Sequence, residues 1–187
     1  LGLLYSAFTD FCGFKINSDE DKLMGLASCG NPIYYDTIVH NLVKIYEDGS
    51  YKLNLEYFDF YLGGNMTNEK FVRLFGGEAR KPEERITKRE MDLAASIQRV
   101  TEDIVIKAAT FAKEITGLTN LCLAGGIVLN CVANGKLLQE KIFDHIWIQP
   151  AAEDIGGALG AAYYLYYHRW DRLRIPEAGD SEKGSYL

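Results

Sequence analysis

The stretch Leu121-Cys-Leu-Ala-Gly-Gly-Ile-Val-Leu-Asn130 decides the fold class, because a short apolar strand there runs into a glycine pair and then a helix. A second junction of this kind, Ile146-Trp-Ile-Gln-Pro-Ala-Ala-Glu-Asp-Ile-Gly-Gly157, follows one helix later. We therefore predict an α/β fold with a parallel pair of strands. The expected elements are strands at 121–124 and 145–149 and helices at 128–140 and 154–170.

Both glycine junctions are expected at the same edge of the sheet, the C-terminal edge of its parallel strands. Ligands bind at this edge, and glycine lets the backbone approach them closely. The first pair lacks the third glycine of a dinucleotide fingerprint and the Lys-Ser or Lys-Thr of a P-loop, so backbone N–H groups and helix N-termini would hold any phosphate. We interpret Gly125, Gly126, Gly156 and Gly157 as two sides of one phosphate or nucleotide site. Tight turns without a ligand are the alternative.

Two polar side chains accompany these junctions. Asp154 follows a strand and precedes a helix, where a carboxylate could bind a divalent cation that bridges phosphate oxygens. The alternative is a helix N-cap, for which aspartate is a preferred residue. Asn130 could likewise hydrogen-bond a ribose or base, or cap the helix that follows it.

The chain before residue 121 is expected to supply a scaffold. The capping box Thr87-Lys-Arg-Glu90 precedes apolar residues at every third or fourth position as far as Gly117, which predicts one long helix. Asp48-Gly49, between two apolar runs, predicts a β-hairpin. We expect the packed domain to span residues 1–172 and a linker to occupy 173–187.

Composition excludes some classes of protein. The formal net charge is −6 and the basic residues are dispersed, which disfavours a nucleic-acid partner. No apolar run approaches the roughly 18 residues that a membrane span needs, so we expect a soluble, cytoplasmic protein without a membrane partner. The four scattered cysteines are predicted to be reduced thiols in the core: Cys12, Cys29, Cys122 and Cys131.

Four segments of the chain resemble the O-carbamoyltransferases of nodulation-factor and antibiotic biosynthesis. They are Tyr5-Ser-Ala-Phe-Thr, Asp21-Lys-Leu-Met-Gly-Leu-Ala27, Leu123-Ala-Gly-Gly-Ile-Val-Leu-Asn-Cys-Val-Ala-Asn-Gly-Lys136 and Ile148-Gln-Pro-Ala-Ala-Glu-Asp-Ile-Gly-Gly-Ala-Leu-Gly-Ala-Ala162. The resemblance implies the second half of an actin-like, sugar-kinase-like ATPase-type domain, related to the transferases that place threonylcarbamoyl on transfer RNA. It also implies a second domain of the same polypeptide, beyond residue 187, that makes carbamoyl-adenylate from carbamoyl phosphate and ATP. The carbamoyl group would then pass to a hydroxyl of a small-molecule acceptor.

The resemblance also implies roles for individual residues. Asp154 matches the family's metal-binding aspartate, for which the metal would be Fe, Zn, Mn or Mg. Gly125, Gly126 and Asn130 match its Gly-Gly-Val-x-x-Asn element beside the nucleotide. Lys22 and Gly30 fall in the segment that lines the nucleoside in related proteins.

The sequence departs from the family at one point, because the His-x-x-x-His pair is absent. The resemblance implies that these histidines would precede Leu1, so the catalytic residues are unknown and we expect the fragment to be inactive alone. The alternatives are a kinase-like nucleotide-binding domain, a domain like the transfer-RNA threonylcarbamoyl transferases, or a non-catalytic scaffold. A scaffold predicts that alanine at Asp154 and the glycines leaves ligand binding unchanged.

Overall fold

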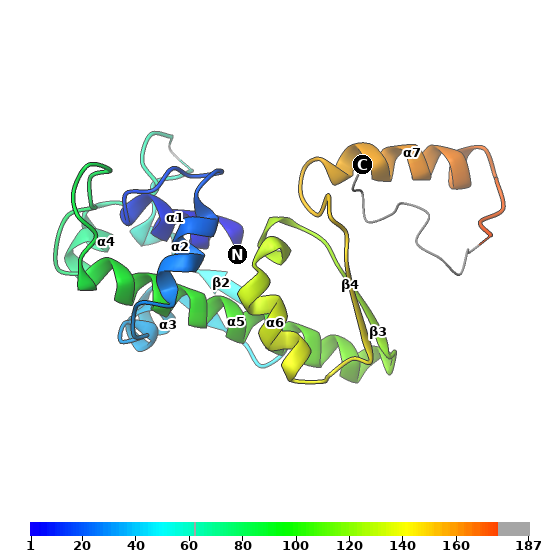
Figure 1. Ribbon diagram of the computed structural model, residues 1–187, viewed down its shortest axis with the longest axis horizontal. Coiled ribbons are helices and arrows are strands. Elements are labelled where there is room, and N and C mark those ends of the chain that lie inside the picture. Colours follow the sequence, from blue (N-terminus) through cyan, green and yellow to red (C-terminus); the bar gives the residue numbers. More distant parts are fainter. Residues whose placement is uncertain (62, 176–187) are drawn as a thin grey trace. The chain divides into compact units, whose positions relative to one another are not determined.

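The computed structural model describes residues 1–61 and 63–175, which form two compact units of a mixed α/β fold (Figure 1). Unit 1 comprises described residues from 1–118 and 130–142, and unit 2 comprises residues 119–129 and 143–175. From residue 176 onward, the linker expected at 173–187 lies outside the described residues. Within the described ranges, no helix is both long and apolar enough to cross a membrane.

The central element of unit 1 is the long helix α5, Lys88–Thr116. Thr87 and Glu90 form the expected capping box, in which the Glu90 carboxylate accepts a hydrogen bond of 2.8 Å from the Thr87 backbone N–H. The helix ends at Gly117, whose φ of 65° is left-handed. The prediction of one long helix is therefore confirmed.

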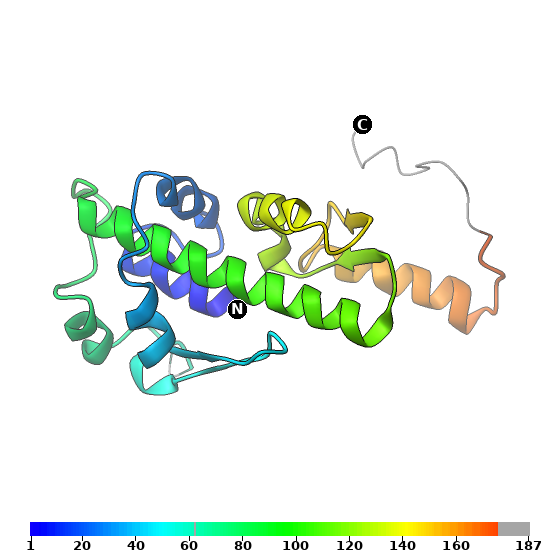
Figure 2. The ribbon, with the colours of Figure 1, turned by 90° about the horizontal axis from the view of Figure 1, so that it is seen from below.

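Shorter helices line α5 in unit 1 (Figure 2). They are α1 (Gly2–Phe11), α2 (Glu20–Ala27), α3 (Tyr35–Asn41) and α6 (Cys131–Gln139). Aromatic rings join α1 to α4 (Glu69–Leu74): the ring centroids of Phe11 and Phe71 are 4.9 Å apart and those of Phe8 and Phe71 are 5.2 Å apart. All three rings are fully buried, which places the core of unit 1 at this cluster.

The predicted hairpin is also present in unit 1. Strands β1 (Val43–Ile45) and β2 (Tyr51–Leu53) are antiparallel, with Val43 opposite Leu53, and η1 (Leu55–Tyr57) follows them. The turn contains Gly49 with φ 78°. A Cβ at Gly49 would overlap the backbone of Ala108 on α5, so glycine is needed both for the turn and for the packing.

Unit 2 contains the predicted parallel pair of strands. In β3 (Asn120–Leu123) and β4 (His145–Ile148), Leu121 lies opposite Ile146. The 3₁₀ turn η2 (Gly126–Leu129) follows β3, and α7 (Gly156–Tyr163) follows β4 and continues as the π-helical turn η3 (Tyr164–Arg169). The α/β class and its parallel unit are thus confirmed.

The predicted starts of two helices and the predicted burial of three cysteines are wrong. Helix α6 begins at Cys131 rather than at 128, because residues 126–129 form a 3₁₀ turn and Asn130 has the extended backbone of an N-cap. Helix α7 begins at Gly156 rather than at 154. Only Cys12 of the four free cysteines is buried, and burial raises the pKa of its thiol to about 12. Cys29, Cys122 and Cys131 are exposed.

Candidate functional site

The two glycine junctions of unit 2 are hydrogen-bonded to each other. The Gly125 backbone N–H donates to the Ala152 carbonyl oxygen at 2.6 Å. Gly125 has φ 108°, a conformation that L side chains rarely adopt. Next to it, a Cβ at Gly126 would lie 3.7 Å from the Glu153 carboxylate. The segments that follow β3 and β4 therefore meet at one edge of the strand pair.

The structure gives different explanations for the two glycines of the second junction. A Cβ at Gly156 would overlap the Ala151 carbonyl oxygen, so a tight turn requires glycine there. A Cβ at Gly157 would have no described heavy atom within 4 Å, and the same holds at Gly125. Turn geometry thus accounts for Gly125 and Gly156, whereas Gly157 leaves open space beside the backbone.

Asp154 lies in the turn that leads into α7. Asp154 is exposed, and its backbone carbonyl accepts a hydrogen bond from the Gly157 N–H at 3.1 Å. The N-cap position belongs to Ile155, so Asp154 does not cap the helix. No cluster of three or more His, Cys, Asp or Glu occurs among the described residues. Among the described residues, Asp154 therefore has no partner carboxylate, histidine or cysteine group with which to complete a metal site, and it could supply one oxygen ligand.

Asn130 caps α6 and is buried in unit 1, with 7% of its surface exposed. Its Oδ1 accepts hydrogen bonds from the Ala133 backbone N–H at 3.0 Å and from Gln98 Nε2 at 3.1 Å. Its Nδ2 donates to Gln98 Oε1 at 2.8 Å. The two side-chain amides therefore form a reciprocal pair, and the capping alternative for Asn130 is confirmed.

The amide pair belongs to a larger polar network in unit 1. The Tyr5 hydroxyl donates to Gln98 Oε1 at 3.0 Å, and Gln98 Nε2 also donates to Glu102 Oε1 at 3.1 Å. Lys136 of α6 forms a 2.7 Å ion pair with Glu102. Burial raises the pKa of Tyr5, and a hydrogen bond from Asn130 opposes that rise. The sequence signal for the network was a glutamine inside the apolar period of α5.

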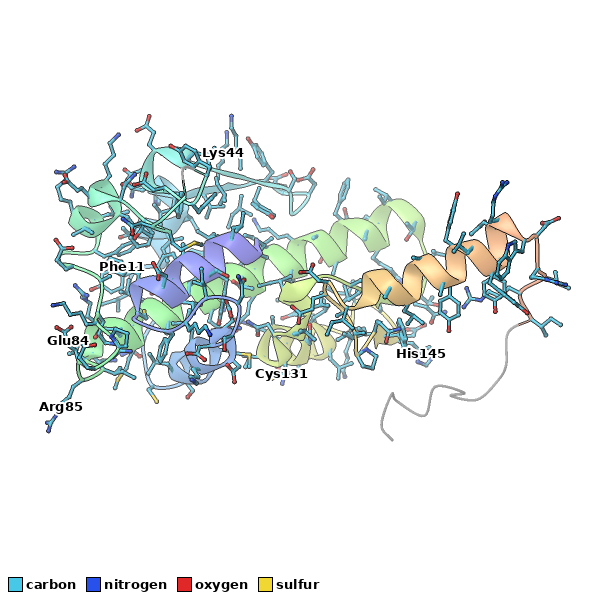
Figure 3. The ribbon with its side chains drawn as sticks, turned by 90° about the horizontal axis from the view of Figure 1, so that it is seen from above. Phe11, Lys44, Glu84, Arg85, Cys131 and His145 are labelled. Atoms are coloured by element: carbon cyan, nitrogen blue, oxygen red, sulfur yellow. The ribbon has the colours of Figure 1, made fainter. Side chains whose placement is uncertain are left out.

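Lys22 and Gly30 lie near opposite ends of α2. Lys22 is exposed and forms a 2.8 Å ion pair with Asp19. It lines an open cavity of about 650 Å³, together with Arg80 and Arg85. Figure 3 shows Arg85 extending away from the ribbon. Gly30 packs on α5, where a Cβ would overlap the backbone carbonyl of Met91.

Arg80 is a buried residue that the sequence did not single out. Its guanidinium donates to five backbone carbonyls, those of Cys12, Gly13, Lys81, Pro82 and Glu84. It also lies over the Phe14 ring, 5.2 Å from the centroid. Arg80 thus ties the loop after α1 to the loop before α5. The mixed segment around it has no period from which this role could be predicted.

Comparison with known proteins identifies the family. Residues 1–163 match the family model described as "Carbamoyltransferase N-terminus". The chain is 54% identical over its full length to "Uncharacterized protein sll1178" of Synechocystis, of which it covers 30%. It is 38% identical over 88% of its length to "Nodulation protein NolNO" of Sinorhizobium fredii, and 37% identical over 87% of its length to "Nodulation protein NolO" of Bradyrhizobium diazoefficiens. It covers 22% and 27% of these two relatives, so it spans less than a third of each of the three. The chain therefore belongs to the carbamoyltransferase family, to whose N-terminal region nearly all of it corresponds.

Proposed function

We propose that this chain is part of an ATP-dependent O-carbamoyltransferase that passes a carbamoyl group from carbamoyl-adenylate to a hydroxyl of a small-molecule acceptor. The adenylate would be made from carbamoyl phosphate and ATP by another domain of the same polypeptide. In the transfer step the acceptor oxygen forms a bond to the carbamoyl carbon, the bond from that carbon to the phosphate oxygen breaks, and AMP leaves while the hydroxyl proton is lost. The family match over residues 1–163 supports this reaction class.

The single observation that carries the proposal is the Gly125 to Ala152 hydrogen bond. It brings the two strand-to-helix junctions together at the edge where α/β folds bind ligands. Gly125, Gly126, Gly156 and Gly157 would line the nucleotide there, with the open space beside Gly157 as supporting evidence. Asn130 belongs to the same sequence element and caps α6.

Asp154 is the proposed metal ligand. An exposed carboxylate in this turn suits a divalent cation that also binds phosphate oxygens and water, and Fe, Zn, Mn and Mg are the candidates. Such a cation would neutralise negative charge as AMP leaves. The remaining protein ligands would come from other parts of the polypeptide, which is why we expect the fragment to be inactive alone.

Lys22 and Gly30 are proposed to contact the nucleoside on the ground of the family resemblance. The exposure of Lys22 supports its availability to a ligand, whereas the packing of Gly30 on α5 supplies a structural reason for that glycine. An actin-like, sugar-kinase-like fold for the complete domain is part of the same proposal. The mixture of a long helix with a small parallel sheet is compatible with it.

Calorimetric titration with ATP and AMP, with and without Mn²⁺, tests the division of the site between this chain and the rest of the polypeptide. The full-length protein is expected to bind, and the 187-residue fragment to bind weakly or not at all. Tight binding by the fragment would show a self-contained site. In parallel, the full-length protein should consume ATP only when carbamoyl phosphate is present, and consumption independent of carbamoyl phosphate would contradict the proposed reaction.

A further inference from the structure

We propose that Gln98 is a positioning residue of the carbamoyl-transfer step, acting through its amide pair with Asn130. The inference rests on the proposed function and deepens it, because it assigns the buried network of α5 to the step in which AMP leaves. Gln98 does not touch the nucleotide in this proposal. It fixes the residue at which the Gly125-Gly126 loop ends and α6 begins.

The geometry of the amide pair fixes the position of α6 along α5. The Gln98 and Asn130 amides exchange two hydrogen bonds, of 2.8 and 3.1 Å, so each supplies one donor and one acceptor to the other. Apolar packing alone between α5 and α6, which lie in contact, would tolerate small slides of one helix along the other. A reciprocal amide pair does not tolerate such slides, because a shift breaks both hydrogen bonds.

The amide pair is held in turn by its neighbours. The Tyr5 hydroxyl fixes Gln98 Oε1 from α1, and the Glu102 carboxylate fixes Gln98 Nε2 from the next turn of α5. Lys136 of α6 completes the link through its 2.7 Å ion pair with Glu102. Three helices therefore determine the orientation of one glutamine.

Apolar side chains of similar shape at these two positions could contribute as much to the free energy of folding as the amide pair does, or more. Gln98 is 4% exposed and Asn130 is 7% exposed, and buried amides are destabilising unless their hydrogen bonds are satisfied. Asn130 Oδ1 and Nδ2 both have partners within unit 1, so the side chain holds position rather than reaching outward. Through the chain, Asn130 directly follows Leu129, the last residue of the 3₁₀ turn that begins at Gly126. The pair thus fixes the N-cap residue of α6, which is the residue that directly follows the glycine loop in the chain.

The test uses the full-length protein with ATP, carbamoyl phosphate and glycerol as the hydroxyl-bearing probe. Pyrophosphate release reports activation, and AMP release reports departure of the carbamoyl group. Gln98→Met keeps the length of the side chain and removes its hydrogen bonds. We expect the kcat for AMP release to fall about tenfold or more, since small misplacements far from the reacting atoms have effects of this size. The KM for ATP in pyrophosphate release should stay within about twofold of the wild-type value.

A double-mutant cycle separates positioning from general stability. Asn130→Asp keeps an oxygen to cap α6 but replaces the amide donor to Gln98. If the two residues act as a pair, Gln98→Met combined with Asn130→Asp should slow AMP release no more than the worse single variant. Thr101→Val is the matched control, because Thr101 is buried one turn along α5 and its hydroxyl has no hydrogen-bond partner in the described structure. Its AMP release should be unchanged.

The outcomes distinguish the two proposals. AMP release is measured at a temperature well below the melting temperature of the Gln98→Met variant. If the variant then releases AMP at the wild-type rate, the positioning role is overturned, whereas the proposed reaction is not. Equal loss of pyrophosphate and AMP release would also overturn it. A wild-type protein that releases neither product under these conditions would instead refute the proposed function itself.

Discussion

The backbone N–H of Gly125 donates a 2.6 Å hydrogen bond to the carbonyl oxygen of Ala152, and this contact joins the ends of β3 and β4. It leaves the glycine in a left-handed conformation, with φ 108°. The same backbone that bonds to Ala152 is the one proposed to lie beside the nucleotide. A change at Gly125 should therefore affect the geometry of both junctions.

Gly125→Ala is expected to strain this loop by about 1–2 kcal/mol, because a Cβ disfavours positive φ. We predict about a tenfold slower AMP release in the full-length protein, measured with ATP and carbamoyl phosphate. Gly160→Ala is the control, since Gly160 lies within α7 and a Cβ there meets no described heavy atom within 4 Å. Equal effects of the two variants would argue against a special role for the loop.

Asp154→Ala should abolish carbamoyl transfer while leaving carbamoyl-adenylate formation nearly intact, because the proposed cation acts when AMP leaves. Pyrophosphate and AMP release measured on the same sample separate the two steps. Asp144→Ala serves as the control, because Asp144 is an exposed aspartate that directly precedes β4, at the other end of the strand. Loss of both steps in Asp154→Ala would refute this division of labour.

Gly30→Ala is expected to destabilise unit 1 by about 1–3 kcal/mol, the usual range for overpacking, because its Cβ would overlap the Met91 carbonyl on α5. Gly25→Ala, within α2 and without a described neighbour in 4 Å, should be neutral or stabilise by about 0.5–1 kcal/mol. Denaturant unfolding of both variants gives the comparison. A stable Gly30→Ala protein with impaired nucleotide binding would instead favour direct contact with the nucleoside.

Acid should weaken unit 1 through two buried carboxylates at the start of α5. Burial alone would raise the pKa of Asp92, but hydrogen bonds from Lys88 and from the Asn31 backbone N–H hold that pKa below its ordinary value. The pKa of Glu90 is likewise lowered by Thr87, against the effect of burial.

Because the folded-state pKa values are depressed, these groups contribute stability above their unfolded pKa values of about 4 and lose it as pH falls further. Chemical unfolding of the Asp92→Asn variant between neutral pH and about pH 3 should show a shallower decline on the acid side than wild type. An unchanged acid slope would mean that Asp92 does not contribute.

Local sequence signals predicted most of the secondary structure. The Thr87 to Glu90 box and Gly117 mark the ends of α5 because capping involves residues a few positions apart. Asp48-Gly49 predicted the hairpin because a tight turn, like a helix cap, depends on neighbouring residues. The start of α6 was misplaced because the apolar run that follows Gly126 fits a helix and a 3₁₀ turn equally well.

The long-range contacts could not be predicted. Gln98 and Asn130 are 32 positions apart, and Arg80 reaches the carbonyl of Cys12 across 68 positions. No periodicity encodes such pairs, since their partners are set only by the packing of whole helices. The two glycine junctions could be located from the sequence because tight turns that require glycine leave a local pattern, whereas the roles proposed for the residues there stay predictions.

The chain crosses between the two units three times, because α6 belongs to unit 1 while β3 and β4, the strands that it connects, belong to unit 2. Neither unit is one continuous stretch of sequence. A polypeptide that stops after Leu118 would lack α6 and with it the Asn130 partner of Gln98, and one that starts at Thr119 would contain α6 without α5. Producing one unit alone therefore requires an internal deletion bridged by a linker, or co-expressed fragments, rather than simple truncation.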